Sequence, residues 1–124
     1  MRLSILSGIV FAWISGLCLP AYAQDAVAGA RIFQSQCSIC HSPQPGRNVV
    51  GPSLFGVVGR HSGVIPNFRY STANQSSGLV WTPPTLDRYL TAPRQVVPGT
   101  LMSYPGLKDD RERGDLIAYL ASLR

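Results

Sequence analysis

Cys37-Ser38-Ile39-Cys40-His41 is the stretch of sequence that decides the fold. Two cysteines separated by two residues and followed at once by histidine are the attachment signature of a c-type haem. In this pattern each thiol adds to a vinyl group of the haem, and the next residue is placed so that its imidazole reaches the iron. The motif therefore predicts one haem c, bound covalently through Cys37 and Cys40, with His41 as an iron ligand.

Two other kinds of site use closely spaced cysteines, a zinc site and a redox-active dithiol. A structural zinc site would need a second Cys/His pair, and His61 is the one other histidine in the sequence. A thioredoxin-like dithiol is expected in a βαβ context, which the flanking residues do not offer. We therefore favour haem attachment over both alternatives.

The first 23 residues are typical of a secretory signal peptide. A positive start precedes the apolar run of residues 3–19, and Ala21-Tyr22-Ala23 fits a small-x-small cleavage site. Cleavage after Ala23 would leave residues 24–124 as one periplasmic domain with no stable membrane insertion. The alternative is an uncleaved anchor, for which the apolar run is short. We interpret Cys18 as an apolar member of the signal rather than a lipid attachment site.

The charge of the chain is moderately positive, with 11 Lys and Arg against 6 Asp and Glu, a net charge of +5. The basic residues are scattered and form no dense run, so the sequence does not indicate binding to nucleic acid. A weak attraction to an acidic protein partner fits this distribution better.

The hydrophobic pattern predicts an all-α chain with long loops. Residues 42–63 and 96–106 are expected to be loops, and a loop as long as the first is expected to wrap a cofactor. Gly29 lies on the apolar face of the first helix, which suggests that another backbone comes close. Four helices are expected: from Asp25 through Cys37, from Tyr70 to Ser76, from Thr82-Pro83-Pro84 to an end at Pro93, and from Asp109 and Asp110 onward.

A haem iron that transfers electrons without binding substrate takes a sixth ligand, and Met102 and His61 are the candidates. Met102 lies in the turn-rich segment Pro98-Gly99-Thr100-Leu101-Met102. A thioether opposite an imidazole raises the reduction potential of the iron. A lone methionine is often core filler, but this one is not on a periodic apolar face. His61 lies in a polar stretch typical of a surface, so we favour Met102.

The chain around these residues resembles class I cytochromes c, close to the mitochondrial type and its bacterial relatives. The likeness covers nearly all of residues 25–122. It implies the cytochrome c fold, three main helices and long loops around one haem, in which Gly29 and Phe33 of the first helix meet Leu116 and Tyr119 of the last. The segments that carry it are Gly51-Pro52-Ser53-Leu54-Phe55-Gly56, Val58-Gly59-Arg60, Tyr70-Ser71-Thr72-Ala73-Asn74, Leu79-Val80-Trp81, Pro98-Gly99-Thr100-Leu101-Met102 and Asp115-Leu116-Ile117-Ala118-Tyr119-Leu120.

The resemblance also implies a role for each matching residue. His41 and Met102 would be the axial ligands, and the Pro52 carbonyl would accept a hydrogen bond from the other nitrogen of His41. The remaining positions form two groups: Arg60, Tyr70 and Trp81 would contact or neutralise the haem propionates, and Asn74, Tyr89 and Thr100 would form a polar network beside Met102.

The function that the resemblance implies is one-electron transport rather than catalysis. The chain would be a soluble, monomeric carrier in a respiratory chain, between a respiratory complex or periplasmic dehydrogenase and an oxidase or reductase. A haem peroxidase or gas sensor would need an open iron site, against which Met102 argues. A further alternative is a haem-bearing subunit or membrane-anchored domain of a dehydrogenase or oxidase complex.

The chain departs from its mitochondrial relatives around the expected haem edge. Phe68 replaces a tyrosine that often helps to hold a propionate, and Tyr104 replaces a phenylalanine. The docking surface is therefore expected to be more apolar and less positive. The positions that match the ring of lysines hold Gln36, Val49, Arg94, Gln95, Leu101, Asp109 and Asp110.

Overall fold

The computed structural model describes residues 23–124. In this part of the chain the regular structure is helical, and an isolated bridge between His61 and Val80 is the one β-type pairing. The all-α class expected from the sequence is confirmed. The predicted signal peptide, apart from Ala23, lies outside the described residues. Residues 23–124 form five helices: α1 (Ala26–Gln36), α2 (Thr72–Ser76), α3 (Pro83–Thr91), α4 (Pro93–Val96) and α5 (Asp110–Ser122).

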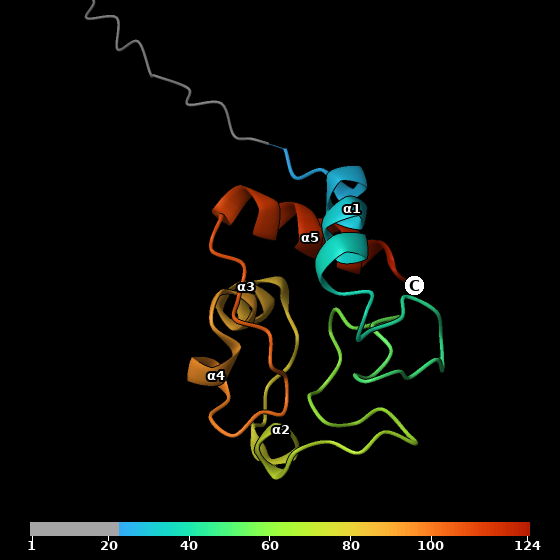
Figure 1. Ribbon diagram of the computed structural model, residues 1–124, viewed down its shortest axis with the longest axis vertical. Coiled ribbons are helices and arrows are strands. Elements are labelled where there is room, and N and C mark those ends of the chain that lie inside the picture. The colour runs from blue at the N-terminus through green and yellow to red at the C-terminus, as the bar shows by residue number, and fades with distance from the viewer. Residues whose placement is uncertain (1–22) are drawn as a thin grey trace, which may run out of the picture.

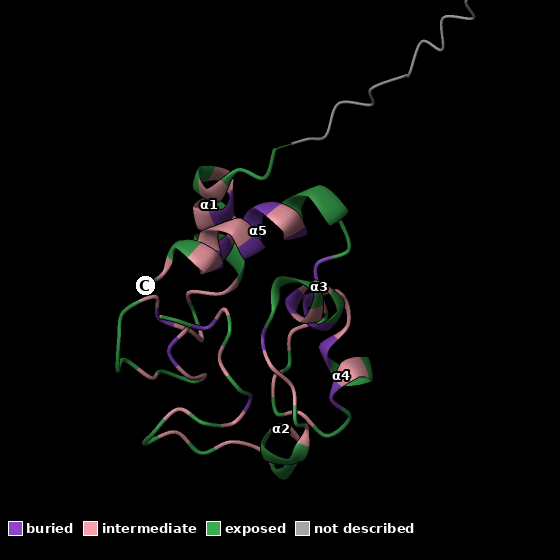
Figure 2. Cartoon of the chain, turned by 180° about the vertical axis from the view of Figure 1, so that it is seen from behind, coloured by how far each residue is buried: buried purple, intermediate pink, exposed green. Residues whose placement is uncertain are grey.

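Figure 1 shows α1 and α5 together at one end of the domain, α2 at the other end, and the long α1–α2 connection along one side. Helix α1 packs on α5, and α3 packs on both α4 and α5. Buried residues lie on the inward faces of α1, α3 and α5 (Figure 2).

Helix α1 begins and ends where its sequence predicts. The carboxylate of Asp25 accepts hydrogen bonds from the N–H groups of Val27, at 2.8 Å, and Ala28, at 3.1 Å, which no backbone carbonyl of the helix can satisfy. At the other end the N–H of Cys37 donates to the carbonyl of Phe33 at 2.8 Å. The first cysteine of the motif is therefore fixed by the last turn of a well-capped helix.

The crossing of α1 and α5 confirms the expected close approach at Gly29. A Cβ atom at Gly29 would lie 2.0 Å from the carbonyl oxygen of Asp115, so only glycine allows the two backbones this close. One turn further along, the rings of Phe33 and Tyr119 pack with their centroids 5.3 Å apart. The N–H of Asp25 also donates to the carboxylate of Asp115 at 2.7 Å. These contacts set the position of α1.

The predicted start and end of α3 are confirmed, but the short helix that follows it was not predicted. Helix α3 starts as expected, with the Thr82 hydroxyl accepting from the N–H of Thr85 at 3.3 Å. It ends at Thr91, just before Pro93, and Pro93 then begins the short helix α4, so the expected loop from Val96 starts one residue later. The reason is that proline lacks an N–H, which is no loss in the first turn of a helix.

The long loop between α1 and α2 is held by backbone hydrogen bonds to distant segments. The N–H of Gly56 donates to the carbonyl of Leu123 at 2.7 Å, and that of Gly59 donates to the carbonyl of Trp81 at 3.0 Å. Both glycines have positive φ angles, 66° and 88°, which few other residues adopt. The expected loop is confirmed, and these turns give it a fixed course.

A buried arginine ties α5 to α3 and to the segment between α4 and α5. Arg113 is only 5% exposed, and it donates to Asp87 at 2.7 Å, to Asp110 at 2.6 Å and to the carbonyl of Leu107 at 2.9 Å. Burial alone would lower the pKa of Arg113, but its hydrogen bonds to the two aspartates raise this pKa above its ordinary value. The charged guanidinium therefore fixes one end of the segment that carries Met102.

Candidate functional site

The two cysteines and the histidine of the motif lie in a tight turn directly after α1. The N–H groups of Cys40 and His41 both donate to the carbonyl of Cys37, at 3.0 and 2.9 Å. Both cysteines are free thiols and half-buried. Two causes raise the pKa of Cys37 to about 11: its burial, which has the larger effect, and the neighbouring Cys40. As long as its sulfur is unattached, Cys37 is therefore a neutral thiol at physiological pH.

The ring of His41 is fixed by its backbone surroundings. Its Nδ1 lies 2.8 Å from the carbonyl oxygen of Pro52, so Nδ1 carries the proton and the lone pair of Nε2 remains free for a metal. Burial lowers the pKa of His41; the Pro52 hydrogen bond opposes this shift and the charge of Arg60 adds to it. A Cβ at Gly51 would lie 2.3 Å from Cε1 of the ring, so glycine is needed beside it.

A second group of residues gathers around Met102. The Tyr89 hydroxyl lies 3.4 Å from Sδ of Met102 and 3.3 Å from Oγ1 of Thr100. Thr100 in turn donates to Oδ1 of Asn74 at 3.0 Å. This network, expected from the resemblance, joins α2, α3 and the segment after α4. It orients the thioether while leaving a lone pair on the sulfur.

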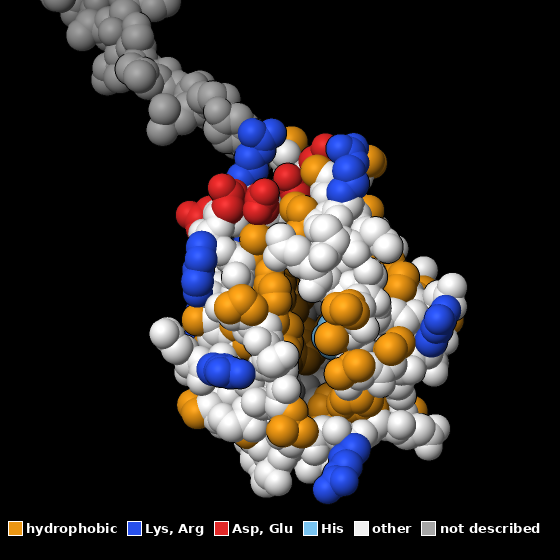
Figure 3. Space-filling view, in the orientation of Figure 1, with side chains coloured by type: hydrophobic (Ala, Val, Ile, Leu, Met, Phe, Trp, Pro, Cys, Tyr) orange, Lys and Arg blue, Asp and Glu red, His pale blue; other side chains and the backbone are white. Residues whose placement is uncertain are grey.

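Between these two groups the surface is hollowed. Figure 3 shows a cleft lined largely by hydrophobic side chains, with a histidine visible inside it. Partly buried apolar side chains pack against the core from both sides of the domain, including Cys37, Leu54, Val58, Leu79, Met102 and Tyr104. An imidazole nitrogen and a thioether sulfur beside an apolar cleft are suited to an apolar ring system that carries a metal.

Comparison with known proteins agrees with this geometry. The cytochrome c family model matches residues 26–124. The chain is 53% identical over 100 residues to cytochrome c2 of Rhodopila globiformis, covering 81% of this chain and 94% of that protein. It is 49% identical over 102 residues to cytochrome c2 of Blastochloris viridis, covering 82% and 80%. Cytochrome cH from Methylobacterium extorquens superimposes with a TM-score of 0.74 at 40% identity, covering 79% of this chain and 98% of that one.

The chain belongs to the cytochrome c family. It is a c-type cytochrome, an electron carrier rather than an enzyme, and it carries one haem attached through the motif of Cys37 and Cys40. It exchanges electrons with protein redox partners. The expected membership of the class I cytochromes c and the expected cytochrome c fold are both confirmed.

The residues of this cytochrome fit a haem at this position. Both thiols are free to form thioethers, Nε2 of His41 has a free lone pair, and the cleft is apolar. Arg60 is half-buried, and no carboxylate in residues 23–124 forms an ion pair with it. A half-buried cation without an acidic partner is suited to a ligand that brings its own negative charge.

The three residues expected near the propionates lie on one side of the cytochrome. Arg60 donates to the carbonyl oxygens of Ser53, at 2.9 Å, and Phe55, at 3.1 Å. Trp81 is next to Arg60, because its N–H donates to the Arg60 carbonyl at 2.9 Å, and the Tyr70 hydroxyl accepts from the N–H of Ile65. Burial raises the pKa of Tyr70, while the Ile65 hydrogen bond and the Arg60 charge lower it.

His61 and Met102, the two candidates for the sixth ligand, have different surroundings. His61 is exposed, and its backbone pairs with Val80 in the isolated bridge. Met102 is partly buried, and the Tyr89 hydroxyl orients its sulfur. Met102 therefore has the surroundings expected of a metal ligand with an oriented donor atom. His61 has the surroundings of an ordinary surface side chain.

Sequence reasoning missed two contributors to the site. Gly51 was noted only as part of a matching segment, and its contact with the His41 ring depends on the turn that brings residue 51 back to the motif. Ser71 caps α2 and also donates to Oδ1 of Asn74 at 2.8 Å, which extends the network beside Met102. A Gly-Pro pair and a serine before a short helix are signals that could have pointed to them.

Proposed function

We propose that this cytochrome is a periplasmic one-electron carrier whose haem iron is bound by His41 and Met102. The observation that carries the proposal is the pair of oriented donor atoms: the Pro52 carbonyl fixes His41, and the Tyr89 hydroxyl fixes Met102. Two protein ligands close the iron to substrates and favour electron transfer. The haem, when bound, supplies a centre that accepts and releases one electron as its iron alternates between the ferric and ferrous states.

The chain's own residues would keep the reorganisation energy of each electron transfer low. The hydrogen bonds to His41 and Met102 hold both donor atoms in place, and the apolar cleft excludes water. Arg60, with Tyr70 and Trp81 nearby, would balance the negative propionates. Rigid surroundings of this kind need little rearrangement when the charge at the centre changes by one unit.

Export to the periplasm is part of the proposal. It is supported by the sequence of residues 1–23, with cleavage expected after Ala23. Within residues 23–124 no helix is long and apolar enough to cross a membrane. The mature chain, residues 24–124, would act as a monomer between a respiratory complex or periplasmic dehydrogenase and an oxidase or reductase.

The visible spectrum of the exported protein tests this proposal, recorded oxidised and reduced, with and without carbon monoxide. We expect a low-spin c-type spectrum, a weak far-red sulfur-to-iron band and no shift with carbon monoxide. A high-spin spectrum that shifts with carbon monoxide would mean an open iron site and would replace the carrier with an enzyme or gas sensor.

A haem-bearing subunit or membrane-anchored domain of a dehydrogenase or oxidase is the second candidate. The apolar residues at the expected haem edge favour it, because Val49 is 49% exposed and Leu101 75%. A lasting partner would cover such side chains. The mature N-terminus separates the two candidates: Gln24 as the first residue supports the free carrier, and an intact residue 1–23 segment supports the anchored form.

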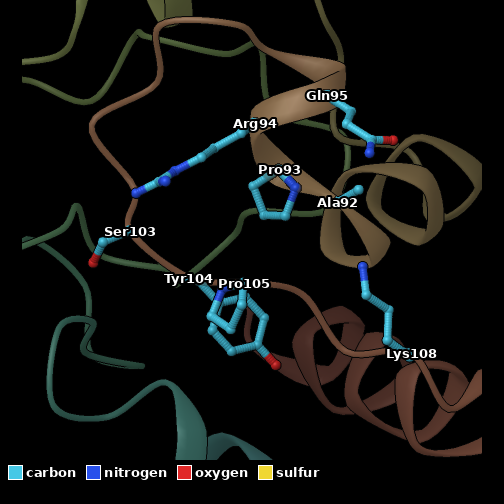
Figure 4. A pocket seen from close by; sticks show the side chains of 8 residues that line it. All are labelled: Ala92, Pro93, Arg94, Gln95, Ser103, Tyr104, Pro105 and Lys108. Carbon is cyan, nitrogen blue, oxygen red and sulfur yellow. The ribbon is translucent and has the colours of Figure 1, made fainter.

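The association rate with a redox partner is expected to depend only weakly on salt. The positive ring of lysine-rich relatives is reduced here to Arg94 with Lys108 nearby, beside a cavity of about 200 Å³ (Figure 4). The electrostatic screening length falls from about 30 Å at 0.01 M salt to about 8 Å at 0.15 M. A docking surface with fewer charges therefore loses less of its association rate when salt is added. Stopped-flow rates over this range should fall less than those of a lysine-rich cytochrome c with the same partner.

A pair of charge-restoring variants is the control for this measurement. Gln95→Lys and Leu101→Lys return positive charge to positions that match the lysine ring, and both should steepen the salt dependence. A steep fall in rate for the unmodified protein, equal to that of the lysine-rich relative, would contradict the prediction.

The Met102–iron bond is expected to survive to higher pH than in lysine-rich relatives, or to give way to hydroxide. The positions that match displacing lysines hold Arg94, Gln95 and Leu101, which are poor or absent nitrogen donors. Lys108, the single lysine, donates to the carbonyl of Thr91 at the end of α3. The measurement is the far-red band across an alkaline titration, with Arg94→Lys as the variant that restores an amine. Spectroscopic evidence of lysine ligation in the unmodified protein at mildly alkaline pH is the contrary result.

A further inference from the structure

Tyr104 and Gln36 connect two segments that are far apart in the chain. The Tyr104 hydroxyl donates to Oε1 of Gln36 at 2.5 Å, across 68 positions of sequence. Gln36 is the last residue of α1, directly before Cys37, and Tyr104 follows Met102 by two residues. The hydrogen bond therefore links the segment that holds the haem covalently to the segment that carries Met102.

The other hydrogen bonds of residues 97–108 lead to the opposite side of the cleft. Among the residues that the structure describes, these bonds reach α2, α3, α4 and α5, and none of them reaches α1 or the motif. Without the Tyr104–Gln36 bond, the hydrogen bonds of this segment would therefore reach only one side of the cleft. The bonds to other parts of the chain are those of Thr100 with Asn74 and Tyr89, Met102 with Tyr89, Val97 with Pro93, Leu107 with Leu90, Lys108 with Thr91, and Arg113 with Leu107 and Lys108.

The residues that hold α1 against α5 are not next to Gln36. Its close contacts with α5 are at Gly29 and Phe33, in the middle of the helix. Gln36 lies beyond them and is exposed. The α1–α5 crossing therefore joins the two sides of the cleft at one end, and the Tyr104–Gln36 bond joins them at the exposed rim of the cleft.

The ring of Tyr104 has free space beside it. It borders the cavity of about 200 Å³ formed with Ala92, Pro93 and Lys108 (Figure 4). The ring packs in part against the core and in part borders this cavity, and the hydrogen bond to Gln36 holds its hydroxyl. A phenylalanine at this position would have the same ring and no such bond.

We propose that the Tyr104–Gln36 hydrogen bond is a latch that holds the Met102 segment against the end of α1 and slows its opening. The latch rests on the ligation by Met102 proposed above. Tyr104 acts as a positioning residue, because its effect on the iron passes through the position of Met102. An intramolecular hydrogen bond of ordinary net strength corresponds to about three- to tenfold in an opening equilibrium.

The test is the rate at which imidazole binds to the oxidised holoprotein, since imidazole reaches the iron only after Met102 leaves it. Tyr104→Phe and Gln36→Met are each expected to raise this rate about three- to tenfold, and the double variant no further than either single one. Gln36→Glu keeps an acceptor oxygen and should restore a rate close to that of the unmodified protein. Tyr119→Phe is the matched control, because it removes a tyrosine hydroxyl away from the rim.

Each outcome decides between the latch and a merely structural contact. Rates for Tyr104→Phe equal to those for Tyr119→Phe, or additive effects in the double variant, would overturn the latch. A rate rise that only follows a loss of global stability in denaturant unfolding would do the same. The far-red band of the unmodified protein is a separate readout: its absence overturns the Met102 ligation, whereas a normal band with unchanged rates overturns the latch alone.

Discussion

A Met102→Ala variant is expected to lose the far-red band completely, to become high-spin and to bind carbon monoxide when reduced. Alanine has no donor atom, and the Tyr89 hydroxyl would lose the sulfur that it contacts at 3.4 Å. The reduction potential should also fall, because a thioether ligand stabilises ferrous iron. Visible spectra and a redox titration of the holoprotein measure both changes.

The matched control is His61→Ala, which removes the other candidate ligand. His61 is exposed and its described pairing is through the backbone, so its loss should leave the spectrum, the carbon monoxide response and the potential unchanged. If His61→Ala opened the iron and Met102→Ala did not, the assignment of the sixth ligand would be reversed.

A Gly29→Ala variant is expected to lower the free energy of unfolding by about 1–3 kcal/mol, although alanine is the better helix former. The added methyl would lie 2.0 Å from the Asp115 carbonyl oxygen and 2.8 Å from Cβ of Tyr119, so the two helices must move apart. Denaturant unfolding of the holoprotein, followed by far-UV circular dichroism, gives the change.

The same substitution at Gly114 provides the control. A Cβ at Gly114 would meet only the flexible side chain of Gln24, at 3.4 Å or more. Gly114→Ala should therefore raise the free energy of unfolding by about 0.5–1 kcal/mol through helix propensity. Equal changes for the two variants would show that the α1–α5 crossing is looser than described.

The sequence predicted those parts of the fold that depend on local chemistry. Asp25 and Asp109 are side chains that cap helices, and both do so. The motif predicted the haem attachment because its spacing is specific to that chemistry. Pro93 ends α3 as predicted, but the short helix α4 that it begins was missed, because proline is also compatible with the first turn of a helix and only the course of the chain after Ala92 shows that one follows.

The pairings between distant residues could not be predicted from local pattern. Arg113 lies in a helix with an apolar stripe, and arginine is rarely buried. Its burial depends on Asp87 of α3, which is 26 positions away in sequence, together with the nearby Asp110 and the Leu107 carbonyl. The contact of Tyr104 with Gln36 likewise depends on the folded chain. The network of Asn74, Tyr89 and Thr100 was expected only because the chain resembles a known family.

The crossing of α1 and α5 also has a consequence for the order of folding. Asp25 and Asp115 are bonded across 90 positions of sequence, so α1 is synthesised long before its main partner α5. Closing so long a loop is entropically costly and slow. A nascent chain that ends before α5 would expose the apolar face of α1, and these two helices can pack only after α5 has been made.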